Sequence, residues 1–396
     1  MKNLILSKSI LVILVLAGGI SCAQAPEKVY SVVKEIHPFE WYMTQAEGWK
    51  KVLDRDPKNG SAWLYFYTAN RMMWLTERDR WEKFQEPWIK TPSEIVALAQ
   101  KAIPGTFESA YIKVWNDPDG ANHEKDLMTA YQLSKGSPEI LDEMAMFYEI
   151  RRNFDKRKEI NTRWYESNDI PAGILNYNYN VLMTLPENGL ILTNGDNDTF
   201  PLWVLQDALG IRKGVCVLNI NLLRMNDYRT KVFGELGIPD ISFNPSIVKN
   251  QDTVQVLRQL IIGQVLEKSK RPVYIALTID RRYYDDSRLM NDLYLEGLAL
   301  RYDKKSYDNL GVIRRHFEND YLLDYLKENF HTDATKSVTD QINTGYLPSL
   351  VKLCKHYQSS HETERLEAIR RMISNITQAW GNQGDFKDME PYINCN

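Results

Sequence analysis

The chain has 396 residues, of which 43% are hydrophobic and 26% are charged, and this balance excludes wholesale disorder and a protein built from many membrane spans. Its net charge of −3 offers no basic excess for phosphates, so nucleic acid is not an expected partner. Four cysteines are too few for a disulfide scaffold, and the length suggests two or three structural units.

Residues 1–21 have the three parts of a secretory signal peptide. Two lysines precede an apolar run over residues 10–16, which is far shorter than the roughly 20 residues that span a membrane. The next residues resemble a bacterial lipobox, in which Cys22 would become the lipid-bearing first residue, although glycine replaces the usual leucine. Residues 23–25 offer an ordinary signal-peptidase site instead. Either cleavage predicts an extracytoplasmic protein, periplasmic or attached to the outer membrane only through a lipid on Cys22.

Residues 22–170 are expected to be helical, because apolar side chains recur at three- and four-residue spacing. The turn at residues 56–60 and the helix after it resemble the junction between tetratricopeptide repeats. Residues 137–154 resemble the first helix and turn of a second repeat, and the helix after them departs from the repeat pattern at Arg157 and Asn161. The resemblance implies hairpins that bury their apolar faces by stacking on neighbours. The same spacing favours core packing over a glycan or peptide groove for the tryptophans of this region.

Residues 171–303 are expected to form an α/β domain with a parallel βαβ core. Three short apolar runs predict buried strands, at residues 190–193, 215–220 and 273–278. Residues 200–209 predict a helix that ends at Gly210, which would link the first two strands by a right-handed crossover. A further helix is expected to begin at Asp252 or Thr253.

Residues 304–396 are expected to be mainly helical. The spacing of apolar residues predicts helices over residues 321–326 and 366–376. Cys354 and Cys395 would be able to pair in an oxidising compartment, and the sequence leaves this pairing open.

The segment LTNGDNDTFPLW at residues 192–203 resembles part of the bacterial membrane proteins called DUF2723, relatives of animal transmembrane protein O-mannosyltransferases. Further similar blocks follow in the expected order, at residues 210–223 and 271–301, although Gly214 stands where the family tends to have aspartate. The family's enzymes carry a multi-span membrane domain before this soluble part, and their transferase chemistry is placed there. The resemblance therefore implies an extracytoplasmic portion without that membrane domain and without catalytic residues to carry over.

Oxygen-bearing side chains after the first predicted strand form the candidate ligand-binding loop: Asn194, Asp196, Asn197, Asp198 and Thr199. Loops at the carboxyl ends of parallel strands line the usual ligand crevice. Asp196 and Asp198 would suit Ca²⁺ or Mg²⁺ and resemble the D-x-D pair of nucleotide-sugar transferases. The alternative is structural, since Asn-Gly favours a turn and Asp198 or Thr199 would cap the following helix.

These observations favour a non-catalytic extracytoplasmic lipoprotein that binds a protein or glycan partner of a cell-envelope glycosylation or assembly system. The alternative is a glycosyltransferase-like, carbohydrate-active enzyme that uses a divalent cation at residues 194–199. No firm cofactor and no catalytic residue follow from the sequence, which contains no recognised hydrolase or phosphate-binding motif. A structural envelope lipoprotein without a specific ligand is the third reading.

Overall fold

The computed structural model describes residues 25–83, 88–118, 120–243, 252–285, 287–305, 308–327 and 336–381. The predicted signal peptide, Cys22 and Cys395 lie outside these ranges. The chain is mostly helical and contains a small mixed sheet. This composition is broadly consistent with the predicted α/β region between helical flanks. A search of the described residues finds no helix that is long and apolar enough to cross a membrane.

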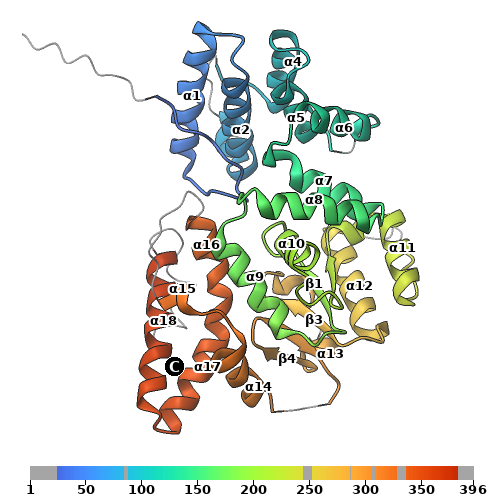
Figure 1. Cartoon of the computed structure of the whole chain (residues 1–396), viewed down its shortest axis with the longest axis vertical. Coiled ribbons are helices and arrows are strands. Elements are labelled where there is room, and N and C mark those ends of the chain that lie inside the picture. Colours follow the sequence, from blue (N-terminus) through green and yellow to red (C-terminus); the bar gives the residue numbers. More distant parts are fainter. Residues whose placement is uncertain are drawn as a thin grey trace, which may run out of the picture.

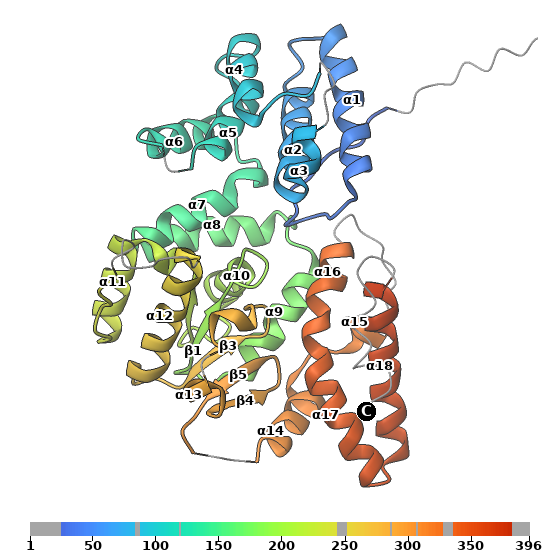
Figure 2. The same ribbon diagram turned by 180° about the vertical axis from the view of Figure 1, so that it is seen from behind.

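Helices make up the first part of the chain, at one end of the molecule (Figures 1 and 2). They are α1 (Phe39–Arg55), α2 (Gly60–Thr76), α3 (Arg78–Lys83), α4 (Pro92–Ala102), α5 (Phe107–Asn116) and α6 (His123–Leu133). Helix α2 begins where the turn at residues 56–60 predicts, because the Asn59 side chain accepts a hydrogen bond from the Ala62 amide at 2.9 Å. Buried aromatic side chains of α1 and α2, such as Tyr42 and Phe66, form the apolar core of this end.

Two helices join this end to the sheet region: α7 (Leu141–Ile150), preceded by the 3₁₀ turn η1 (Pro138–Ile140), and α8 (Phe154–Glu166). The side chains that break the repeat pattern dock α8 on α10 (Phe200–Leu209). Arg157 donates two hydrogen bonds to Asp207 of α10, at 2.9 and 3.1 Å, and Asn161 donates a third at 2.7 Å. Arg157 also pairs with Glu149 of α7, which is almost fully buried. Arg157 and Asn161 therefore serve a contact with the α/β region.

The sheet has five strands in the order β2-β1-β3-β5-β4. They are β1 (Leu190–Thr193), β2 (Cys216–Asn219), β3 (Val273–Ala276), β4 (Leu293–Glu296) and β5 (Ala299–Tyr302). Strand β1 pairs in parallel with β2 on one side and β3 on the other, and β5 is antiparallel to both β3 and β4. The sheet is therefore mixed, and its β4–β5 hairpin was not among the predicted strands.

Helices and short turns surround the sheet. They are α9 (Ala172–Thr184), η2 (Leu222–Arg224), α11 (Asn226–Leu236), α12 (Thr253–Lys268), η4 (Arg281–Tyr283) and α13 (Ser287–Met290). Helix α10 covers the predicted residues and ends at Gly210, whose φ of +74° belongs to the left-handed region that favours glycine. Asp252 caps α12 as predicted, since its side chain accepts hydrogen bonds from the amides of Val254 and Gln255.

The last part of the chain packs beside the sheet region (Figure 2). It comprises α14 (Leu310–Arg315), the π-turn η5 (His316–Asp320), α15 (Asp324–Lys327), α16 (Lys336–Asn343), η6 (Thr344–Tyr346), α17 (Leu347–Ser359) and α18 (Thr363–Gly381). Helix α18 contains the predicted residues 366–376. The helix predicted over residues 321–326 is wrong in its first half. There the Asn180 side chain bonds both the carbonyl and the amide of Leu322, at 2.9 and 2.8 Å, which replaces helical hydrogen bonds.

Asp207→Ala should lower the free energy of unfolding by about 3 kcal/mol or more, because it leaves the buried Arg157 guanidinium without its main partner on α10. Urea denaturation followed by circular dichroism measures this. The control is Glu159→Ala on the same helix as Arg157, which removes an exposed pair with Lys156 and should cost less than about 0.5 kcal/mol. Equal effects in the two variants would contradict the docking role of Asp207.

Candidate functional site

The candidate loop, residues 194–199, joins the end of β1 to the start of α10. Strand β1 lies between β2 and β3, and all three run in the same direction. The loop therefore stands at the edge of the sheet where the carboxyl ends of neighbouring strands meet, which is the usual place for a ligand in α/β sheets.

Asp198 holds this loop together. Its buried carboxylate accepts hydrogen bonds from the amides of Asn194 and Gly195, at 2.9 and 2.6 Å, and from the hydroxyl of Thr278. Burial raises the pKa of Asp198, and these hydrogen bonds oppose the rise. The Asp198 side chain thus closes a turn within the loop. The predicted helix cap is not formed, because neither Asp198 nor Thr199 caps α10 through its side chain.

Two other residues of the loop also face its interior. The buried Thr199 hydroxyl lies 2.7 Å from the Thr193 hydroxyl. It also accepts a hydrogen bond from the side-chain amide of Asn219 at 3.0 Å. The Asn194 carbonyl accepts hydrogen bonds from Asn219 and Asn221. These contacts tie the loop to the end of β2, so Thr199 and the Asn194 backbone have structural partners in place of a ligand.

Asn197 connects the loop to more distant segments of the chain. Its side chain donates a hydrogen bond to the Val33 carbonyl at 2.9 Å, and its own carbonyl accepts one from Asn178 of α9 at 2.8 Å. The extended segment before α1 is thereby held against the loop.

Asp196 is the loop carboxylate that stays available. It is exposed to solvent within a hollow, yet protein surrounds it closely enough that burial raises its pKa to about 6. The charge of Asp198 adds to this rise and Arg71 opposes it. No described residue donates a hydrogen bond to this carboxylate.

The predicted metal pair is not assembled as a metal site. In the described ranges, no group of three or more His, Cys, Asp or Glu side chains is placed to hold a metal ion. Both carboxylate oxygens of Asp198 already accept hydrogen bonds from the protein. Only Asp196 presents its carboxylate to an approaching group, so the contacts give Ca²⁺ or Mg²⁺ no support.

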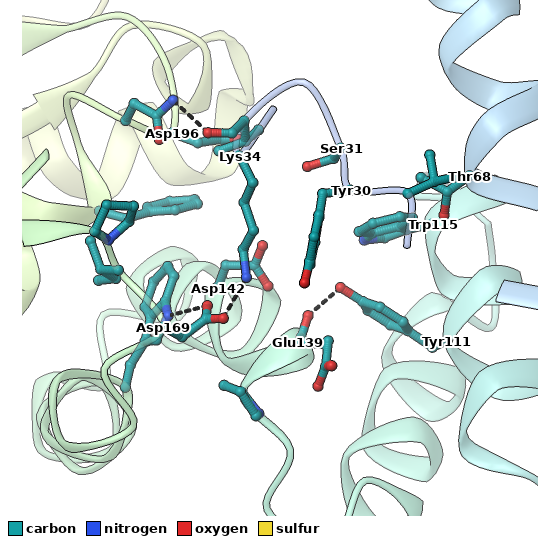
Figure 3. A pocket seen from close by; sticks show the side chains of 18 of the residues that line it. Tyr30, Ser31, Lys34, Thr68, Tyr111, Trp115, Glu139, Asp142, Asp169 and Asp196 are labelled. Carbon is teal, nitrogen blue, oxygen red and sulfur yellow. Dashed lines mark hydrogen bonds and ion pairs between the residues drawn. The ribbon is translucent and has the colours of Figure 1, made fainter. Parts of the chain in front are cut away.

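A cavity of about 90 Å³, here called the aromatic cavity, lies on one side of Asp196 and Asn197 (Figure 3). It is enclosed by the segment before α1, by α2, α5 and η1, by the turn between α8 and α9, and by the start of α10. Aromatic rings form much of its wall: Tyr30, Tyr65, Tyr111, Trp115, Trp164 and Phe200. Rings of this kind offer flat apolar faces with polar edges.

Acidic side chains from separate elements meet at the aromatic cavity. Burial, then the charges of Glu143 and Asp196, raises the pKa of Asp142 well above its usual range. Burial and the charge of Asp196 raise the pKa of the adjacent Glu143 to about 7. Asp169 lies on the same wall and forms an ion pair with Lys34 at 2.5 Å. Carboxyl groups whose pKa values are raised therefore stand close to an aspartate that is paired with a lysine.

A wider hollow of about 770 Å³, here called the crevice, lies on the other side of the loop. The loop and the residues after β3, Leu277 and Thr278, form one wall, and α16, η6 and the start of α17 form the opposite wall. Its size is within the range of pockets that bind small organic ligands. Asp196 and Asn197 line both the crevice and the aromatic cavity, so the predicted loop forms part of the wall of each.

Sequence reasoning located the loop but missed the acidic partners Asp142, Glu143 and Asp169, and Lys34 as well. Asp142 and Glu143 begin α7 with two adjacent acids, which is common in the first turn of any helix. Nothing in their local pattern shows that they face a loop more than fifty residues later. The tryptophans were predicted to pack in the core, and Trp115 and Trp164 pack there while also lining the cavity.

A family model described as TMEM260-associated domain 2 matches residues 174–233, from α9 to α11, and this range contains the candidate loop. The model belongs to a protein O-mannosyltransferase-related family, which suggests a glycosylation-related context. No curated protein matches the chain.

Asp198→Asn should lower the free energy of unfolding by about 1–3 kcal/mol, because an amide cannot accept all the hydrogen bonds that close the loop. Asp196→Asn is the matched control two residues away and should leave stability unchanged or slightly higher, since that carboxylate is unpaired and costly to ionise. Chemical denaturation at neutral pH compares the two. Greater loss in the Asp196 variant would contradict the assigned roles.

Glu143→Gln should stabilise the protein at high pH but not at low pH. The pKa of Glu143 is raised from 4.5 to about 7 in the folded state. The stability that this shift contributes to the fold is therefore fully present below pH 4.5 and is lost as the pH rises through 7. Glutamine mimics the protonated form, and its advantage over the wild type should grow by ~1–3 kcal/mol across that window. Thermal unfolding against pH measures it. Glu159→Gln should show no such gain, because the pKa of Glu159 is lowered by Lys156.

Proposed function

We propose that the chain is a non-catalytic extracytoplasmic protein that binds a glycan, or a protein that carries one, in a cell-envelope glycosylation or assembly system. The observation that carries this proposal is that Asp196 and Asn197 line both the aromatic cavity and the crevice. A ligand seated there would contact aromatic faces, carboxylates and amides at once.

The lining of the aromatic cavity supports a sugar in particular. Aromatic rings pack against the apolar faces of sugar rings, and carboxylates accept hydrogen bonds from hydroxyl groups. Tyr30 and Trp115 supply rings on one side, and Asp142 and Asp196 supply carboxyl groups on the other (Figure 3). At about 90 Å³ this cavity suits one end of a ligand, and the crevice has room for its continuation.

The proposal also covers the family to which the chain is related. The chain would correspond to the soluble part of the DUF2723 family, with N-terminal hairpins derived from tetratricopeptide repeats and a parallel βαβ unit at its centre. The family-model match over residues 174–233 supports a relation to the TMEM260 family in this part of the chain. Export with a lipid on Cys22 would place the binding site in the periplasm or on the outer membrane.

A carbohydrate-active enzyme is the second candidate, and one observation favours it. Asp196, which lines the aromatic cavity, has a pKa raised to about 6, and burial together with the charge of Asp196 raises the pKa of Glu143 to about 7. Such carboxyl groups are suited to donate and accept protons in glycosidic chemistry. The version with a divalent cation at residues 194–199 has no such support. Turnover of a sugar donor or glycoside that disappears in Glu143→Gln would favour the enzyme over the binding protein.

Asp196→Asn should weaken glycan binding about 10- to 100-fold, because it removes the charged acceptor shared by both hollows. A glycan array identifies the ligand, and isothermal titration calorimetry measures the affinity of the wild type and the variant. Asp54→Asn is the control and should bind normally, because Asp54 is an exposed acid on α1 that pairs with Lys50 of the same helix. Absence of binding to every envelope glycan and glycopeptide, or equal affinity in Asp196→Asn, would refute the proposal.

A further inference from the structure

The aromatic cavity has an excess of acidic groups. Asp142, Asp169 and Asp196 line it, and among the described residues on its wall Lys34 is the basic one. Arg71, on α2, lies behind the wall over the Trp115 ring, at 5.4 Å, and its charge reaches Asp196 and Glu143. The cavity therefore attracts cations more strongly than neutral groups.

A cation from the chain already occupies this cavity. The Lys34 ammonium lies 2.5 Å from the Asp169 carboxylate and 5.8 Å from the centre of the Tyr30 ring. Figure 3 shows the Lys34 side chain extended across the cavity, from the loop of Asp196 towards Asp142 and Asp169. Carboxylates and an aromatic face are the two kinds of group that hold an ammonium ion in proteins.

Lys34 reaches the cavity from residues 29–34, here called the strap, which contain no helix or strand. The strap is held to the acidic loop by the hydrogen bond from Asn197 to the Val33 carbonyl. The Lys34–Asp169 pair is partly exposed, with 27% and 17% of the side-chain surfaces accessible, and pairs of this kind hold their partners weakly. An external ammonium group can therefore compete for the same position.

We infer that the aromatic cavity binds the ammonium group of an amino sugar, and that Lys34 occupies that position until the ligand displaces it. This inference deepens the proposed glycan-binding function by naming the class of sugar. Because one ammonium group replaces another, the charge beside the carboxyl groups stays the same in the wild type, and the exchange sets the apparent affinity.

The test titrates the full chain with glucosamine, glucose and N-acetylglucosamine at neutral pH. The wild type should bind glucosamine more tightly than the two neutral sugars. Lys34→Met removes the internal competitor and should raise the affinity for glucosamine by about 10-fold, in proportion to the fraction of sites that Lys34 occupied. Lys28→Met, on the chain just before the strap and exposed, is the matched control and should leave the affinity unchanged.

Three results would overturn the inference. They are equal affinity for the charged and neutral sugars, no gain in Lys34→Met over Lys28→Met, and binding of Nα-acetyl-lysine amide with no binding of glucosamine. The first leaves the proposed glycan-binding function standing, whereas failure of all three sugars and of the glycan array removes both. If Lys34→Met does not fold, Asp169→Asn decides the matter, because it removes the carboxylate that holds the ammonium group and should abolish the preference for glucosamine.

Discussion

The arrangement of the candidate site depends on one buried carboxylate. Asp198 gathers the amides of Asn194 and Gly195 and the hydroxyl of Thr278, and thereby joins the end of β1 to the segment after β3. A carboxylate that accepts several hydrogen bonds in a buried position fixes backbone geometry more firmly than a neutral turn does. Because the same loop forms a wall of both hollows, the aromatic cavity and the crevice inherit their shape from this interaction.

A second set of buried charges sets the position of the helices that close the aromatic cavity. Glu149 accepts hydrogen bonds from Arg152, Arg157 and Tyr228, and Arg157 also donates a hydrogen bond to Asp207 of α10. A buried ion pair contributes little net stability, but it strongly disfavours any arrangement that separates its partners. This network therefore specifies how α7 and α8 lie on α10, and with them the place of Asp142 on the cavity wall.

Much of the fold follows from local rules, and the remainder depends on contacts that no local rule contains. Helix α10, its glycine stop and the Asp252 cap were predicted because each depends on a few neighbouring residues. The β4–β5 hairpin was missed because Glu296 and Arg301 interrupt its apolar pattern, and they offset each other's charge at 3.5 Å. The cavity was missed because its wall draws on segments from the strap to α10, and only folding brings these together.

The two aspartates of the loop illustrate how structure and site chemistry are linked. They stand two residues apart, and the turn directs Asp198 into the protein while leaving Asp196 facing the hollows. The inward carboxylate is satisfied by hydrogen bonds, but its charge still acts on its neighbour and raises the pKa of Asp196. An approaching cation relieves this repulsion, whereas a phosphate adds to it. The group that shapes the loop would therefore also disfavour anionic ligands, which is why we propose a neutral or cationic sugar rather than a nucleotide sugar as the ligand.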